Sequence, residues 1–192
     1  MSCTAQSFKY LRGRTGCGMM SCKAVLTEAN GDMEKAAELL REKGLAAANK
    51  KASRIASEGM VYAVADTDTK VGAVVEVNSE TDFVAKNESF QDFVKDLAKA
   101  VMEHDPKDVD ALMEVKMGAG TVADELREKI LVIGENLKIR RFDRFNGHNC
   151  AYVLGGGTHG VLVQFDTSDE IAKKPEFTAF GKDVAMHIAA AN

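Results

Sequence analysis

Glu76-Val77-Asn78-Ser79-Glu80-Thr81-Asp82-Phe83-Val84-Ala85-Lys86-Asn87 is the stretch around which this chain is organised. It begins as the end of an apolar strand, residues 71–77, and it leads into a long amphipathic helix that starts near Glu88. Between them lies a polar turn that contains one large ring, Phe83. Junctions between a strand and a helix commonly present functional side chains. Phe83 is therefore either a contact for a partner or a side chain that folds back into the core.

The segments next to this stretch predict a β-hairpin followed by a packed helix. Residues 60–65 and 71–77 are rich in β-forming side chains, and the polar residues 66–70 between them are typical of a hairpin turn. The helix beyond the stretch is expected to end at Asp105-Pro106, because proline disfavours a helical conformation in the residue before it. Its apolar residues recur at helical spacing and form one stripe: Phe90, Phe93, Val94, Leu97, Ala98 and Val101.

A further helix is expected between residues 121 and 134. Thr121 is a suitable N-cap with Asp124 three residues on, which is close to a capping box, and Gly134 is a suitable end. Before this helix, residues 108–117 predict a short helical segment and residues 118–120 a glycine-rich loop. The apolar side of the helix consists of Val122, Leu126, Ile130 and Ile133.

The last third of the chain predicts three more strands and a final helix. The strands are expected at residues 137–145, 150–154 and 160–165, and Asn146-Gly147 is a strong hairpin signal. The glycines at 155–157 also favour a hairpin, because the sequence lacks the lysine and the following helix of a phosphate-binding loop. The final helix starts after Pro175. We therefore expect an α+β fold with about five antiparallel strands and helices packed on one face.

Residues 1–45 predict a unit of three helices that precedes this fold. The first helix covers residues 5–14, Ser21 can cap the second, and Asp32 can cap a third that ends at Gly44. Three helices in so few residues bury only a small core, so the unit is expected to lean on a partner or to act as a docking module. The expected division is residues 1–45 for the docking module, 46–57 for a helical linker and 58–192 for the α+β core subdomain.

Met19 and Met20 stand at the entry to the second helix, in a glycine-rich context. Methionine most often fills a core, but its unbranched thioether also makes an adaptable contact surface. Both alternatives are open for this pair.

Composition excludes several classes of function. The net charge of −4, from 25 basic and 29 acidic residues, argues against a nucleic-acid surface, which needs a basic face. No apolar run approaches the roughly 20 residues that cross a membrane, and the N-terminus lacks the pattern of a secretory signal, so we expect a cytoplasmic protein. The cysteines and histidines show no metal-ligand spacing, and no catalytic or cofactor motif stands out. We therefore expect no metal, no cofactor and no enzyme activity.

Three segments resemble the elongation factor Ts family. Residues 11–26, Leu-Arg-Gly-Arg-Thr-Gly-Cys-Gly-Met-Met-Ser-Cys-Lys-Ala-Val-Leu, resemble its N-terminal signature, and residues 76–86 of the opening stretch resemble its second signature. Residues 133–141, Ile-Gly-Glu-Asn-Leu-Lys-Ile-Arg-Arg, are similar to a third shared block. The matches are long, stand in the family's order and extend from residue 11 to about residue 188.

The resemblance implies a guanine nucleotide exchange factor that binds elongation factor Tu, both GDP-bound and nucleotide-free, and promotes GDP release by disturbing its Mg²⁺ site. It implies that residues 1–45 adopt the ubiquitin-associated-like three-helix fold and dock on the GTPase. The docking positions that match the family are Arg12, Met19, Met20, Ile133 and Gly134. The positions that match its approach to the Mg²⁺ site are Thr81, Asp82, Phe83 and Val84.

The chain departs from the family pattern in three places. Gly13 stands where a charged helical residue is usual, and Leu154 replaces a histidine that contacts the partner, while His159 stands elsewhere. The chain also ends at Asn192, near the end of the first core subdomain of longer members, so a fragment and a short natural form are both open.

Two other functions compete with nucleotide exchange. A pure binding module would use residues 1–45 to recognise a peptide or a ubiquitin-like surface, and would bind without accelerating exchange. An enzyme would need a paired acid and base, a nucleophile or a cofactor loop, and the sequence offers no such constellation.

Overall fold

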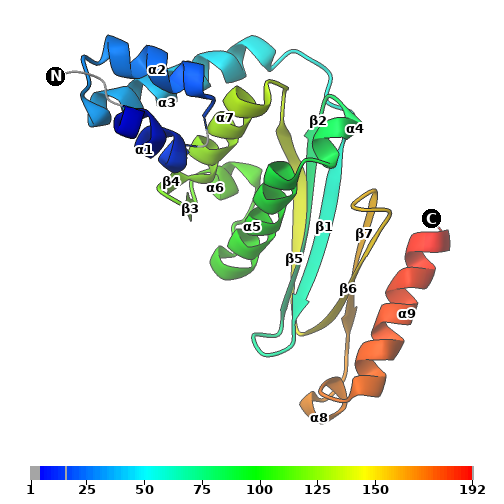
Figure 1. The fold of residues 1–192 in the computed structure, drawn as a ribbon. Helices are drawn as coiled ribbons and strands as arrows, with labels where there is room; N and C mark the ends of the chain where they lie inside the picture. The colour runs from blue at the N-terminus through cyan, green and yellow to red at the C-terminus, as the bar shows by residue number, and fades with distance from the viewer. Residues whose placement is uncertain (1–4, 16, 192) are drawn as a thin grey trace.

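The computed structural model describes residues 5–15 and 17–191, and it has the α+β class that the sequence predicts. Figure 1 shows a group of helices at the N-terminal end, a three-stranded sheet with a helix in front of it, and a two-stranded hairpin beside the last helix. The turn that carries Phe83 lies at the end of the three-stranded sheet that is nearer to the N-terminal helices (Figure 1).

Helices α1 (Ala5–Thr15), α2 (Met19–Glu28) and α3 (Met33–Lys51) form the N-terminal helical unit. Asp32 caps α3 as expected, because its side chain accepts hydrogen bonds from the backbone N–H groups of Glu34 and Lys35. The expected cap at Ser21 is wrong: α2 already begins at Met19, and the Cys22 N–H bonds to the Gly18 carbonyl. The small core of this unit consists of Leu11, Cys17, Cys22, Val25, Leu26, Ala29, Ala36 and Leu40.

The expected end of the third helix at Gly44 is also wrong, because α3 continues to Lys51. Gly44 is buried inside the helix, and a Cβ there would lie 3.5 Å from the carbonyl oxygen of Arg127 in α7 (Val122–Ile133). That distance is an ordinary van der Waals contact, so Gly44 lies within the packed α3–α7 interface and does not act as a stop. The third helix and much of the expected linker therefore form one helix. The N-terminal helical unit packs against α7 through this helix.

Strands β1 (Glu58–Asp66), β2 (Val71–Ser79) and β5 (Lys138–Asn146) form an antiparallel sheet in the order β1-β2-β5. The hairpin between β1 and β2 is confirmed, with Tyr62 opposite Val75. Helix α5 (Glu88–His104) packs across this hairpin, and its predicted stripe is buried. Because strand residues alternate between faces, one face of β2 contributes Ala73, Val75 and Val77 to the same core.

The elements between α5 and β5 close the rest of this core. They are α6 (Val109–Met113), the short strands β3 (Lys116–Met117) and β4 (Gly120–Thr121), and α7. Thr121 and Asp124 form a capping box, and Gly134 ends α7 in the left-handed conformation, so both predictions are confirmed. Gly134 is exposed at that point, and the chain turns there into β5.

The expected hairpin at Asn146-Gly147 is wrong, because β6 (His148–Leu154) pairs with β7 (His159–Phe165) and leaves the three-stranded sheet. The Gly147 N–H bonds to the Lys70 carbonyl, which ties the connection to the β1–β2 turn. The β6–β7 hairpin lies over the sheet face opposite α5. Contact is close there, since a Cβ on Gly160 would clash with the side chain of Val61.

The last helices cover the β6–β7 hairpin and not the α5 face. They are α8 (Asp169–Ala172) and α9 (Pro175–Ala191), and α9 contacts both strands of the hairpin. Buried Gly181 of α9 faces Cys150 of β6, with no room for a Cβ. The five long strands are thus present, but they divide between two sheets with helices on both outer sides.

Candidate partner-binding site

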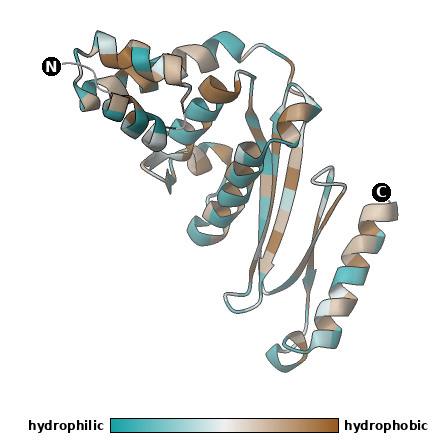
Figure 2. Cartoon of the chain, in the orientation of Figure 1, coloured by the Kyte–Doolittle hydropathy of each residue, from teal (hydrophilic) through white to brown (hydrophobic). Residues whose placement is uncertain are grey.

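Helix α4 (Asp82–Ala85) follows β2 and presents the aromatic side chain singled out in the sequence. The Phe83 side chain is 78% exposed, whereas that of neighbouring Val84 is only 7% exposed and belongs to the main core. Figure 2 shows α4 as a largely hydrophobic turn at the end of the sheet. Val84 thus anchors the turn from the inside, and Phe83 is the apolar group that points to solvent.

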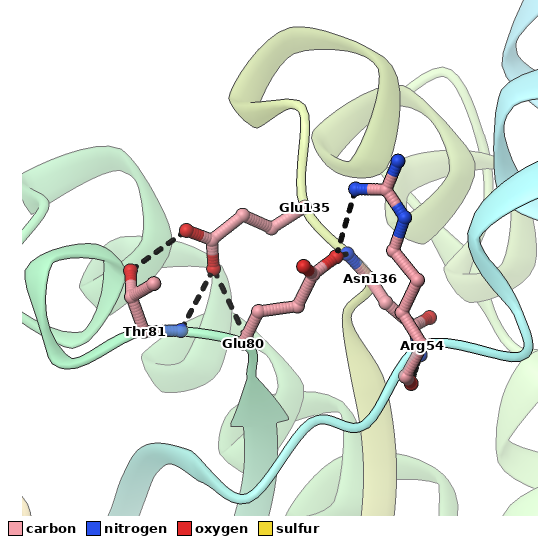
Figure 3. A network of polar contacts seen from close by, with 5 residues as sticks. All are labelled: Arg54, Glu80, Thr81, Glu135 and Asn136. Atoms are coloured by element: carbon pink, nitrogen blue, oxygen red, sulfur yellow. Dashed lines mark hydrogen bonds and ion pairs between the residues drawn. The ribbon is translucent and has the colours of Figure 1, made fainter.

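Glu135 holds the beginning of this turn. One oxygen of its carboxylate accepts hydrogen bonds from the backbone N–H groups of Glu80 and Thr81, each at 3.0 Å. The other oxygen accepts from the Thr81 hydroxyl at 2.7 Å. Figure 3 shows Glu135 reaching these donors from the segment that follows α7. A residue 54 positions away in sequence therefore fixes the backbone just before Phe83.

A second set of contacts ties the linker before β1 to the same place. The Glu80 carboxylate accepts from the Asn136 backbone N–H at 2.6 Å and pairs with the Arg54 guanidinium at 3.4 Å. The Asn136 side-chain amide donates to the Arg54 carbonyl oxygen at 2.8 Å. Figure 3 shows that Arg54, Glu80, Thr81, Glu135 and Asn136 form one polar network. We call these five residues the Glu135 network.

Asp82 and Lys86 form an exposed ion pair on the far side of the turn. Their charged atoms lie 2.7 Å apart, and the Lys86 ammonium lies 5.9 Å from the centre of the Phe83 ring. The hydrogen bond and the charge of Lys86 lower the pKa of the Asp82 carboxyl below its ordinary value. Asp82 is therefore ionised at neutral pH, but a cation already neutralises its charge locally.

The structure brings two of the sequence-predicted groups together. Thr81 to Val84 lie beside the end of α7, because Glu135 bonds to Thr81 and directly follows Gly134. Gly134 is exposed, with a φ of 86° and nothing within 4 Å of where a Cβ would stand. Ile133 is partly buried and packs against the main core.

The third predicted group stands apart from this turn. Arg12 lies in α1 and is exposed, and Met19 and Met20, at the start of α2, are 61% and 76% exposed. Figure 1 shows α1 and α2 well separated from α4. The core of the N-terminal helical unit forms without these two methionines, so they are available as a contact surface.

Leu154 and His159 lie at the two ends of the turn between β6 and β7. Both are exposed, and the His159 ring nitrogen Nδ1 lies 3.1 Å from the Thr158 hydroxyl. They face each other across the last pair of the β6–β7 ladder. His159 is therefore the cross-strand neighbour of Leu154.

Reasoning from the sequence missed the Glu135 network. The available signal was the polar pair Glu135-Asn136, placed between the glycine that ends α7 and an apolar strand. Polar side chains at such a junction indicate bonds to a neighbouring segment, but the sequence does not identify that segment.

The described residues contain neither a metal-binding cluster nor a membrane-spanning helix. Residues 5–15 and 17–191 contain no group of three or more histidine, cysteine or acidic side chains that could hold a metal ion. Within the same ranges, no helix has the length and apolar character needed to cross a membrane.

The chain is similar in sequence to known proteins that share one name. The sequence model of the family described as Elongation factor TS matches residues 80–192. Two proteins named Elongation factor Ts are similar to this chain over 98% of its length. The one from Clostridium perfringens (strain SM101 / Type A) is 49% identical to the chain, and the one from Clostridioides difficile (strain 630) is 50% identical. The namesake from Halorhodospira halophila is 44% identical over the whole chain.

The chain spans 62–64% of the length of these relatives. The family model covers more than half of the chain, including the turn with Phe83 and the segment with Glu135. The chain therefore belongs to the elongation factor Ts family.

Proposed function

We propose that this chain is a guanine nucleotide exchange factor that binds elongation factor Tu, GDP-bound or nucleotide-free, and promotes GDP release by disturbing the Mg²⁺ site of that GTPase. The observation that carries the proposal is Phe83, an exposed ring on a turn whose backbone is fixed by Glu135. Membership of the elongation factor Ts family supports it. On this proposal the chain works in the cytoplasm, catalyses no covalent chemistry, and needs no cofactor, nucleic acid or membrane of its own.

An exchange factor must bind the nucleotide-free GTPase more tightly than the nucleotide-bound form. Coupling between two ligands of one protein is reciprocal. If nucleotide lowers the affinity of the GTPase for the exchange factor by some ratio, the exchange factor lowers the affinity of the GTPase for nucleotide by the same ratio. A protein that bound both forms equally would shift nothing. The chain must therefore make some contact that is possible only when the partner's nucleotide site is distorted.

Phe83 is suited to that contact. An exposed aromatic ring on an anchored turn can enter a gap between two elements of the partner without first leaving a core of its own. Magnesium requires near-ideal octahedral geometry, so a small displacement of its ligands weakens its binding. GDP then loses the charge that neutralises its phosphates. Asp82 is less suited to remove the metal, because Lys86 already compensates its charge.

The experiment that tests this function measures the release of a fluorescent GDP analogue from elongation factor Tu, with and without the chain, by stopped flow. We expect faster release that saturates with increasing chain concentration. Binding to elongation factor Tu without acceleration would favour the pure binding module instead, and no binding to elongation factor Tu would contradict the exchange function.

Docking through the N-terminal helical unit gives a separate prediction. Alanine in place of Arg12, Met19 or Met20 should weaken complex formation roughly fivefold each, the size of a typical contact worth about 1 kcal/mol. Release at saturating concentration should stay near the original rate, since the turn with Phe83 is unchanged. The matched control is Met186→Ala, which removes an equally flexible exposed side chain from α9. An equal loss of rate at saturation would contradict a pure docking role.

A further inference from the structure

The Glu135 network joins three segments that are distant in sequence. These are the linker at Arg54, the turn at Glu80 and Thr81, and the segment after α7 at Glu135 and Asn136 (Figure 3). The linker continues into α3, and α3 packs against α7. The network therefore lies where the path from the N-terminal helical unit meets the turn that carries Phe83.

Most of the hydrogen-bonding capacity of the Glu135 carboxylate is directed at the turn. It accepts three bonds there, two from consecutive backbone N–H groups and one from the Thr81 hydroxyl. Hydrogen bonds to an ionised acceptor are shorter and stronger than neutral ones. Two bonds to adjacent backbone groups also fix the direction of the chain, which a single side-chain contact would not.

Helix α4 needs such an external support. It has only four residues, and Thr81 at its N-cap makes no side-chain cap bond within the helix, because its hydroxyl is directed to Glu135. A single helical turn has little stability of its own. Val84 holds the turn to the core, and the Gln91 side chain of α5 donates to the Ala85 carbonyl at the end of the turn at 3.0 Å. Glu135 adds the bonds that tie the start of the turn to the segment after α7.

We propose that Glu135 is a positioning residue for nucleotide exchange: it fixes the direction of Phe83 relative to the docked N-terminal helical unit. This inference rests on the proposed exchange function and extends it to a residue that touches no nucleotide. The chain binds its partner through exposed surfaces. Glu135 keeps the Phe83 ring in the position in which this binding can distort the nucleotide site of the partner. Loss of Glu135 leaves docking in place and lowers the efficiency of exchange.

The test compares affinity with the maximal rate of GDP release. Glu135→Ala should lower the rate at saturating chain concentration about fivefold, since small misplacements of a working group are costly. It should change affinity for elongation factor Tu less than about twofold, because the exposed docking residues are unchanged. Glu135→Gln should lie closer to the original chain, because an amide oxygen still accepts from both backbone N–H groups. Glu103→Ala, an exposed glutamate on α5, is the matched control and should change neither quantity.

A double-mutant cycle separates positioning from a general loss of structure. If Glu135 acts through Phe83, then adding Glu135→Ala to Phe83→Ala should cost less than about a further twofold in rate, because coupled residues are non-additive. A full additional fivefold loss would overturn the proposal. Thermal denaturation of each variant checks that the fold persists at the assay temperature, and Glu135→Gln keeps the test available if the alanine variant unfolds.

The outcomes distinguish this inference from the function on which it rests. If the original chain fails to accelerate GDP release, the proposed function is wrong. If the original chain accelerates release and Glu135→Ala does so at the same maximal rate, only the positioning role is wrong.

Discussion

Replacing Phe83 by alanine is expected to lower the stimulated rate of GDP release at saturating chain concentration by at least about tenfold. Central aromatic anchors of interfaces typically cost about 2 kcal/mol or more when truncated. For an exchange factor, the part of that energy gained only in the distorted, nucleotide-free complex appears as lost rate. Because the ring is 78% exposed in the free chain, the substitution should leave the stability of the fold nearly unchanged.

The measurement is stopped-flow release of the fluorescent GDP analogue over a series of chain concentrations. Phe83→Leu should give an intermediate rate, since leucine keeps the apolar character and loses the rigid ring. Ile171→Ala is the matched control, because it also removes an exposed apolar side chain, but from α8. An unchanged rate at saturation for Phe83→Ala would contradict the proposed insertion of the ring into the partner, while a change in affinity alone would make Phe83 a docking residue.

The parts of the fold that sequence predicted well are those fixed by local chemistry. Helix α5 follows from its apolar stripe, and α7 follows from the capping box of Thr121 and Asp124 and the glycine at 134. The β1–β2 hairpin follows from two β-rich runs around a polar turn. In each case the residues that decide the structure lie within one element or next to it.

Two of the errors arose where a distant segment decided the outcome. Gly44 is a common type of helix end, but here it lies inside α3, where it is buried against Arg127 of α7. Asn146-Gly147 is a common hairpin turn, but the Gly147 N–H bonds to Lys70 and β6 pairs with β7. Neither contact could be found from the neighbouring residues in the sequence.

The candidate site also combines a residue that the local sequence singles out with one that only a distant contact reveals. The exposure of Phe83 was one of two alternatives in the sequence, and the presence of a complete apolar stripe in α5 made the exposed alternative reasonable. Glu135 could not be assigned, because its partners lie in a segment more than fifty residues away. Side chains that act by holding another segment become visible only when the two segments are placed together.

The contact between the N-terminal helical unit and α7 contains a second long-range feature, a cavity of about 270 Å³. Its apolar lining includes Leu40 and Leu131, and Glu125 and Glu128 also line it. Burial raises the pKa of Glu128 to about 7, and the negative charge of Glu125 adds to that rise, while the cations of Lys129 and Arg41 oppose it. Burial likewise raises the pKa of Glu125.

A raised pKa means that the folded chain binds the proton of Glu128 more tightly than the unfolded chain does. Between the ordinary value of 4.5 and about 7, the folded state therefore holds more protons, and stability falls as pH rises. The favourable contribution is fully present below pH 4.5 and is lost as pH passes through about 7. The chain should thus be less stable at pH 8 than at pH 5 as far as this group is concerned.

Glu128→Gln should remove this dependence, because glutamine keeps the shape of the protonated acid and carries no charge. We expect the gain in free energy of unfolding from the substitution to be about 1 kcal/mol larger at pH 8 than at pH 5, a value reduced from the full pKa shift because the group is only partly buried. Urea denaturation at the two pH values, followed by circular dichroism, measures the difference. Glu38→Gln, on the exposed side of α3, is the control and should give the same small effect at both. An equal gain for Glu128→Gln at pH 5 and pH 8 would show that Glu128 is already ionised in the folded chain at pH 5. The contact between the N-terminal helical unit and α7 would then contain no protonated Glu128.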